Sequence, residues 1–477
     1  MSKRSTLLSV GSAGLPFYAD PELGALSESI GRNRMLMVGI DVSKCFHSVL
    51  IVDFNGKPVG DPFEFNLLSS GYERFTAKVR QAQEKVNAGY VGFLMEPTGI
   101  YHLNLAEHIK QDFGSISFVN PLSVSRNREE HFFLRHKTDS VDTGSLADLG
   151  VRNVVYDYNI PSGVYATVSA LAREYATLKN DRVSLTNRMT TILDELAPGL
   201  IASDPHHMVS PLFSDFWRCK TAIALLQMII KYGIHALIRM DVDSFTTGMH
   251  DAGIRIHRDR AAQIKSRLCR ILLPLDGGPD AELRGALDTN LGMLGIVEAR
   301  MNVLTGKAGP LLETTPARHL LAIKGASVVN VLGYVGAVKD PAFFARHRQV
   351  WAAAGFKPSI YKSGKIRQKR PRINRAGREL LHGALLQLAM DLAHWCPFFG
   401  YYYERRLCSG ATKKAAKVSL ANKVNRVCFA IMRDDIPFDP GDEAEYSALA
   451  QRWHEMRDAR AQREKKQRRV APMPQRF

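Results

Sequence analysis

The stretch Met35–Asp41, with the sequence MLMVGID, decides the fold of the N-terminal third of this chain, because it is an apolar run that ends in an acid. The run Tyr90–Glu96, YVGFLME, has the same form. Apolar runs of this length, bounded by turn residues, are typical of strands that are buried on both faces of a sheet. A carboxylate at the end of a buried strand normally pairs with a cation or binds a metal ion. We therefore expect Asp41 and Glu96 to belong to a functional site.

The elements around these two runs follow a recognisable order. The residue pattern predicts two further strands before the second run, joined through the turn dipeptide Asn55-Gly56, and then alternating helices and strands. The expected strands cover residues 46–52, 63–66 and 116–119, and the expected helices cover residues 70–88 and 103–112. Three antiparallel strands followed by this alternation is the order of a ribonuclease-H-like domain. Since the first and fourth strands of that fold are neighbours, Asp41 and Glu96 are predicted to come together.

Two further acids complete a candidate metal site. Asp139 and Asp142 are three residues apart in a stretch with helical pattern, which places both on one face. Four converging carboxylates suit a two-Mg²⁺ phosphodiester site, in which the ions lie ~4 Å apart and take oxygen ligands. Lys137, just before the pair, is a further candidate for nucleic-acid contact.

The charge and the cysteine content of the chain limit the classes of protein to which it can belong. The chain has 477 residues and a formal net charge of +17, which indicates a polyanionic partner. No apolar stretch is long enough to span a bilayer, so we expect no membrane partner. The six cysteines include no CxxC pair, which argues against a zinc finger and indicates a reduced, cytoplasmic protein. Cys45 is expected to be a buried thiol and not a metal ligand.

The middle of the chain is predicted to be helical. Residues 164–196 carry apolar side chains at steps of three and four, and only Arg182 interrupts this seam. The spacing predicts a coiled coil and hence self-association, with one long helix packed in a bundle as the alternative. Residues 205–310 are helical by pattern and either extend the coiled coil or form an insertion.

The C-terminal part has features typical of phosphate contacts. Leu320–Ser327 resembles the turn of a helix-hairpin-helix, in which Gly325 lets backbone N–H groups approach a phosphate; a simple packing glycine is the equal alternative. Residues 361–378 contain no acid and precede an apolar helix predicted over 379–393. We interpret them as a cationic loop around Ser363-Gly364 that contacts nucleic acid through Lys362, Lys365, Arg367, Lys369, Arg370, Arg372 and Arg375.

Several blocks of the sequence, in order, resemble the DEDD transposases of the insertion-sequence-110 family, which are described as bridge-RNA-guided recombinases. In the N-terminal third these blocks are Gly39–Lys44, Glu96–Tyr101 and Lys137–Asp142. In the C-terminal part they are Ala354–Pro358, Ser363-Gly364 and Ile373–Gly377. The resemblance covers about residues 35–150 and 315–435.

The resemblance implies an active site shared between domains. The family's metal-binding acids match Asp41, Glu96, Asp139 and Asp142. Its nucleophile matches Ser363, with Ser359 as the rival. In the family this serine attacks DNA and forms a phosphoserine intermediate, while the acidic site with Mg²⁺ completes a composite site across subunits. The implied partners are target and donor DNA, a bridge RNA that pairs with both, and further copies of the chain in a dimer or tetramer, on the bacterial nucleoid when active.

The expected fold class is α/β plus α, in five parts. These are a disordered extension over 1–33, a RuvC-like DEDD domain over 34–155, a coiled-coil or helical region over 160–310, a mainly helical transposase domain over 315–440, and a basic tail over 441–477. Two alternative functions remain from the residues alone. One is a metal-dependent junction resolvase or nuclease without serine chemistry, and the other is a catalytically silent nucleic-acid-binding protein.

Overall fold

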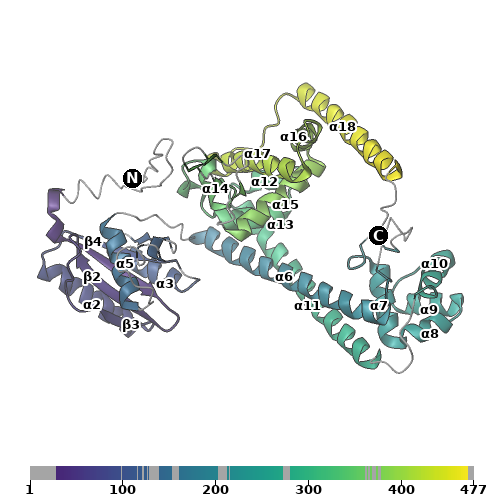
Figure 1. Cartoon of the computed structure of the whole chain (residues 1–477), viewed down its shortest axis with the longest axis horizontal. Coiled ribbons are helices and arrows are strands. Elements are labelled where there is room, and N and C mark those ends of the chain that lie inside the picture. The colour runs from purple at the N-terminus through teal and green to yellow at the C-terminus, as the bar shows by residue number, and fades with distance from the viewer. Residues whose placement is uncertain are drawn as a thin grey trace. The chain divides into compact units, whose positions relative to one another are not determined.

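The computed structural model divides the chain into two compact units, Met1–Ile160 and Pro161–Phe477 (Figure 1). The residues that it describes are 28–97, 99–114, 116–120, 123–125, 127, 139–152, 161–201, 212–213, 215–271, 280–359, 362–363, 366–367, 372–373 and 378–470, without the side chains of 139–141, 358–377 and 464–470. The disordered extension predicted over 1–33 lies outside these residues as far as residue 27. Its described end includes a short 3-10 helix, η1 (Arg32–Arg34).

A five-stranded sheet forms the centre of the first unit, in the order β3-β2-β1-β4-β5. The strands are β1 (Met35–Val42), β2 (Phe46–Asp53), β3 (Phe63–Asn66), β4 (Tyr90–Met95) and β5 (Ser117–Phe118). β1 pairs antiparallel with β2 and parallel with β4, so the predicted neighbours are confirmed. This mixed α/β unit is consistent with the ribonuclease-H-like fold.

Helices cover both faces of this sheet (Figure 1). α2 (Ser69–Lys85) and α3 (His102–Phe113) pack over alternate residues of β1 such as Val38 and Ile40. α5 (Asp139–Val151) packs on the opposite face, which carries Met37. Because β1 is buried on both faces, its sequence is apolar without a break.

Two long helices organise the second unit. α6 (Gly163–Leu196) packs along α11 (Asp280–Glu313). The start of α6 and the end of α11 share one hydrophobic core, whereas the end of α6 and the start of α11 share another, so the two helices are antiparallel (Figure 1). The helix predicted over 164–196 is therefore present, and it packs against a helix of its own chain. Supercoiling of the pair stays a prediction.

The second core is an insertion between α6 and α11. It contains α7 (Lys220–Tyr232), α8 (Ile234–Arg239), α9 (Val242–Asp251) and α10 (Arg258–Leu268). These helices bury apolar side chains against the far half of the α6–α11 pair, including Met189 and Leu294. The region 205–310 thus contains an insertion and also supplies the helix that packs along α6, while its extension of a coiled coil stays a prediction.

The first core is the helical body of the C-terminal half. It contains α12 (Arg318–Leu321), α13 (Val328–Val338), α14 (His347–Ala353), α15 (Glu379–Trp395), α16 (Pro397–Cys408) and α17 (Lys413–Asp434). α13 crosses α6 at a close approach, where Ser169 Oγ donates a hydrogen bond of 2.7 Å to the Gly336 carbonyl. The apolar helix predicted over 379–393 corresponds to α15.

The predicted loose basic tail is instead largely helical. α18 (Glu443–Val470) packs on α16, where Trp453 is buried against Gly400. Arg460, one of the cations of this tail, pairs with the buried carboxylate of Glu404 at 2.8 Å. The tail therefore carries an apolar and ionic anchor that its high charge conceals.

Two smaller expectations concern membranes and thiols. No helix in the described part of the chain is both long and apolar enough to cross a lipid bilayer. Cys45 is exposed in the turn between β1 and β2, so the expectation that it is buried is wrong.

We predict that Gly336→Ala destabilises the second unit by about 1–3 kcal/mol, because a Cβ at this position would overlap the Cβ of Ala172 and approach the Val168 carbonyl oxygen to 3.1 Å. The matched control is Gly383→Ala in α15, where a Cβ meets no atom within 4 Å. That control should stabilise the helix by up to about 1 kcal/mol. Urea unfolding followed by circular dichroism measures both changes, and equal stability of the two variants would contradict the close α6–α13 packing.

Candidate active site

The register of the sheet aligns the first two acids. Ile40 pairs with Met95 across the parallel strands β1 and β4, so the next residues along, Asp41 and Glu96, lie at the same level at the carboxyl ends of the two strands. Both lie on the face of the sheet that α5 covers, because they alternate with Ile40 and Met95 of the opposite core. Asp41 and Glu96 are both half-buried.

The third acid comes from the helix over this face. A Cβ on Gly39 would lie 2.6 Å from the Thr143 carbonyl oxygen and 3.0 Å from the Ala147 nitrogen, so α5 rests directly on β1. Asp142, one residue before Thr143, is 5 % exposed. The absence of a side chain at Gly39 therefore brings the first turn of α5 close to the end of β1.

The structure gives less detail for the remaining predicted residues of this site. Asp139 is the first residue of α5, and its side chain, like all of Lys137, lies outside the described residues. Within the described part of the chain, no group of three or more His, Cys, Asp or Glu side chains is arranged to hold a metal ion. The three described acids share an edge of the sheet but do not form a closed set of ligands.

Three polar residues at this edge were missed from sequence. Ser48 pairs with Asp41 across β1 and β2, and Asn120 follows β5 just beyond β4. His47 is fully buried on the opposite face, and its Nδ1 accepts a hydrogen bond of 3.2 Å from the Ser43 N–H. Burial lowers the pKa of His47 to about 4, so the ring is neutral at physiological pH. These residues are identified as neighbours of the acids only through the pairing of the strands, which the sequence pattern does not predict.

The predicted cationic loop around Ser363 is a β-ribbon. β6 (Pro358–Ser359) pairs antiparallel with β9 (Arg372–Ile373), and β7 (Lys362–Ser363) pairs antiparallel with β8 (Ile366–Arg367). Because the outer strands flank the inner strands in sequence, the chain runs out along one side and returns along the other. Ser363 belongs to the inner pair of strands, opposite Ile366, whereas Ser359 belongs to the outer pair.

Aromatic stacking secures the base of this ribbon. The Phe356 ring lies between those of Trp351 and His382, with centroids 4.1 Å apart on each side. His382 Nδ1 donates a hydrogen bond of 2.9 Å to the Ala354 carbonyl. On the returning side, the Arg378 backbone N–H donates to the Ala353 carbonyl at 2.8 Å. The ribbon therefore leaves from a rigid point between α14 and α15.

A buried lysine lies near the same base and was also missed from sequence. Lys339 follows α13 with a φ of 66° and is 7 % exposed. Burial lowers the pKa of Lys339 to about 7, and the cations of Arg378 and Arg173 lower it further. Arg378 also donates from Nη1 to the Ala337 carbonyl at 3.0 Å. Positive charge is thus concentrated where the ribbon joins the helical body.

The other residues predicted to contact nucleic acid are the cations of residues 361–378 and Gly325. Lys362, Arg367 and Arg372 are strand residues of the ribbon with side chains outside the described residues, and Lys365, Lys369, Arg370 and Arg375 lie outside them entirely. Gly325 packs against α15, where a Cβ would lie 2.7 Å from the Trp395 Cβ and 2.8 Å from the Asp391 carbonyl oxygen. This geometry supports the packing alternative for Gly325, and its contact with phosphate stays a prediction.

Comparison with known protein families agrees with this arrangement. The model of a DEDD transposase, described as a transposase, matches residues 38–198. A second model, described as the transposase IS116/IS110/IS902 family, matches residues 317–404. No curated protein matches the chain.

The two matches, which together span just over half of the chain, define a transposase, a class of enzyme that acts on DNA. The chain belongs to the IS110 family of DEDD transposases. The first match contains Asp41, Glu96, Asp139 and Asp142, and the second contains the whole ribbon with Ser363. The resemblance seen in the sequence is thereby confirmed at the level of the family.

We predict that Gly39→Ala lowers transposition and destabilises the first unit by about 1–3 kcal/mol, because the added methyl group meets backbone atoms of α5 that cannot rotate away. Gly150→Ala is the matched control on the same helix. Its Cβ would come closest to side-chain atoms of Leu94, the two Cδ atoms at 2.6 Å and Cγ at 3.1 Å, so the clash is with a side chain and not with the backbone. Thermal unfolding and a plasmid transposition assay measure both variants, and full activity of Gly39→Ala would contradict the close approach of α5 to β1.

Proposed function

We propose that this transposase moves its own insertion sequence by RNA-guided DNA cleavage and strand exchange, using a Mg²⁺-binding DEDD site and a serine nucleophile. The observation that carries the proposal is the common level of Asp41 in β1 and Glu96 directly after β4, with α5 lying over Gly39 of β1 at Thr143 and Ala147. Within the matched regions, it supports an acidic site in a RuvC-like domain.

The donor set fits Mg²⁺. Asp41, Glu96 and Asp142 offer only carboxylate oxygens, which are the ligands that this ion prefers. Asp139, at the start of α5, is proposed as the fourth ligand. Four carboxylates brought together would repel each other, and a bound cation would offset this repulsion. When bound, Mg²⁺ supplies positive charge to the phosphate oxygens of the scissile bond.

Ser363 is proposed as the nucleophile. Its Oγ attacks the phosphorus of the scissile phosphodiester, a P–Oγ bond forms, and the bond from phosphorus to the bridging deoxyribose oxygen breaks. In net terms, the serine proton passes to the departing deoxyribose oxygen, which becomes a free hydroxyl. Attack by a deoxyribose hydroxyl of the partner strand then breaks the P–Oγ bond and restores the serine. The cationic residues of the ribbon would hold the phosphate and stabilise its charge.

We expect Asp41→Ala to lower recombination by at least about a hundredfold, because a metal-binding carboxylate supports several kcal/mol of charge stabilisation. RNA binding, measured by gel shift, should be unchanged, because Asp41 lies in the acidic site and not in the basic ribbon. The control is Glu107→Ala, an exposed acid on α3. Recombinant DNA junctions are quantified with purified protein, RNA and DNA. Normal yield with Asp41→Ala would remove the acidic site from the mechanism.

Ser363→Ala should abolish recombination while leaving RNA binding intact, because alanine lacks the oxygen that attacks the phosphate. Ser359→Ala is the matched control, since both serines lie in the same ribbon and Ser359 belongs to the outer strand pair. The same junction assay measures both. Loss of activity with Ser359→Ala and not with Ser363→Ala would transfer the nucleophile to Ser359, and activity of both variants would indicate a nuclease without serine chemistry.

Self-association is proposed through α11. Met293, Ile296 and Val303 form an apolar stripe at steps of three and seven along this helix, and Ile296 is 72 % exposed. Such a stripe suits a second copy of the chain, in a dimer or tetramer. We predict that Ile296→Glu lowers the mass measured by light scattering, whereas Asn302→Glu, which lies off the stripe, leaves it unchanged. A wild-type protein that is monomeric with and without nucleic acid would contradict the proposal.

A further inference from the structure

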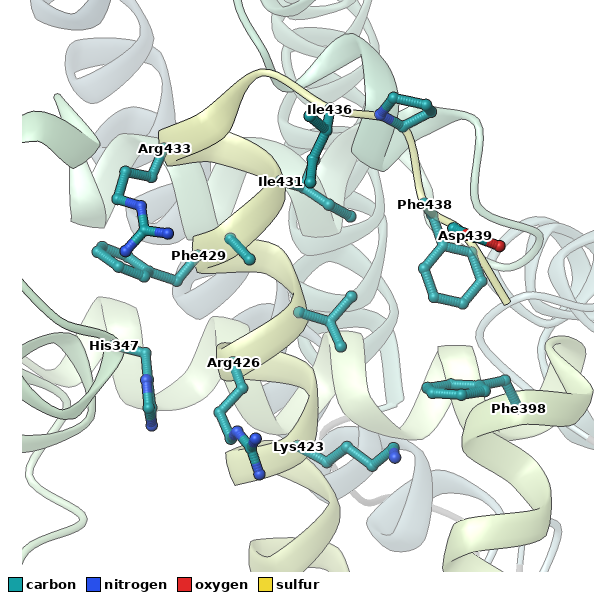
Figure 2. Close-up of a pocket in the computed structure, with 13 residues that line it drawn as sticks. His347, Phe398, Lys423, Arg426, Phe429, Ile431, Arg433, Ile436, Phe438 and Asp439 are labelled. Carbon is teal, nitrogen blue, oxygen red and sulfur yellow. The ribbon is translucent and has the colours of Figure 1, made fainter. Parts of the chain in front are cut away.

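A groove of about 450 Å³ lies on the helical body, and none of the residues that line it is assigned to catalysis. It runs beside α17, and Figure 2 shows its wall formed by that helix, the start of α16 and the segment that follows α17. The Asn425 side chain donates a hydrogen bond of 2.9 Å to the His347 carbonyl, which fixes the rim formed by α14.

The polar side chains of the groove are mainly cationic. Lys423 and Arg426 project from α17 one turn apart, and Arg433 lies two turns further on (Figure 2). Burial lowers the pKa of Lys423, and Arg426 and Arg405 lower it further. Burial likewise lowers the pKa of His347, followed by the effects of Arg426 and Arg348. Cations this close disfavour each other, so a bound anion would stabilise the group.

The acids near the groove already have partners. Asp434 pairs with Arg433 at 2.7 Å, at the end of α17. Asp439 lines the groove, and its carboxylate accepts a hydrogen bond of 2.8 Å from the Gly441 N–H. Lys423 and Arg426 are therefore the cations best placed to meet an incoming anion.

Apolar and aromatic side chains form the remainder of the wall. Phe398 and Phe438 are half-buried, with ring centroids 5.5 Å apart, and Ile436 is 47 % exposed. Lys423 Nζ lies 4.3 Å from the Phe398 centroid. The groove thus offers positive charge and flat apolar surface within a few ångströms of each other.

We propose that this groove binds an unpaired segment of the DNA substrate, with phosphates on Lys423 and Arg426 and a base against Phe398, Phe438 and Ile436. Proteins that hold single strands combine a cationic track with aromatic surfaces on which bases stack. A duplex keeps its bases stacked on each other, so it has nothing to place on an apolar wall. The inference rests on the proposed function, because strand exchange opens the DNA.

The test is fluorescence anisotropy with the full-length protein and a labelled 12-nucleotide oligo(dT), in EDTA so that no cleavage occurs. The variant is Lys423→Gln/Arg426→Gln. The matched control is Lys220→Gln/Arg239→Gln, which removes the same charges from exposed positions on α7 and α8. The groove variant should weaken binding at least fivefold more than the control. The slope of log K against log salt concentration should become shallower by about 1.4, because two phosphate contacts with a single strand are lost.

A second arm tests the base. An abasic oligomer of equal length should bind the wild type at least about fivefold more weakly than oligo(dT), the loss expected for one stacked base. Ile436→Glu, at an exposed position, should weaken oligo(dT) binding and reduce this difference. The first arm changes the protein and the comparison with the abasic oligomer changes the DNA. A folding defect in one variant therefore cannot account for both results.

Three outcomes would overturn the inference. Equal binding by the groove and control variants would exclude the cations, and an equal effect on a duplex would indicate a general phosphate surface. Loss of binding to oligo(U) alone would identify RNA as the occupant. Because the assay needs neither metal nor Ser363, failure of the proposed chemistry would leave it unaffected. Failure of this assay would in turn leave the Asp41 and Ser363 tests intact.

Discussion

The close approach of α5 to β1 is the constraint on which the first unit depends. A helix can rest directly on a strand only where the strand has no side chain, and here that position is Gly39. The contact sets the height of Asp142 above the sheet, while the β1–β4 register sets the level of Asp41 and Glu96. The register therefore places Asp41 and Glu96 at one end of the sheet, and the contact at Gly39 places the start of α5, with Asp142, over the same face.

The sheet was readable from the sequence for a physical reason. A strand buried on both faces has to be apolar throughout, and β1 and β4 are such apolar runs. Asp41 is the penultimate residue of β1, and Glu96 directly follows β4. The order of elements then indicated that these strands are neighbours. The sequence pattern did not give the residues across the strand, such as Ser48 opposite Asp41, because pairing is decided by tertiary contacts.

The ribbon and the C-terminal helix were harder to predict. Residues 361–378 are so rich in cations that they show no alternation of apolar and polar residues, which would indicate strands. The sequence therefore predicted a loop. In α18 the anchor consists of Trp453 and Arg460 within a run of charged residues, and composition alone favours a loose tail. Similarly, the seam of α6 predicted a partner helix, but the partner is α11 of the same chain, more than eighty residues further on.

We propose that Ser363 and the acidic residues act in one reaction. The most direct measurement is a denaturing gel of purified protein incubated with Mg²⁺, labelled DNA spanning the ends of the element, and RNA from the flanking non-coding region. We predict a covalent protein–DNA adduct that requires the RNA and is absent from both Ser363→Ala and Asp41→Ala. DNA cleavage without any adduct, unaffected by Ser363→Ala, would contradict it and indicate a metal nuclease.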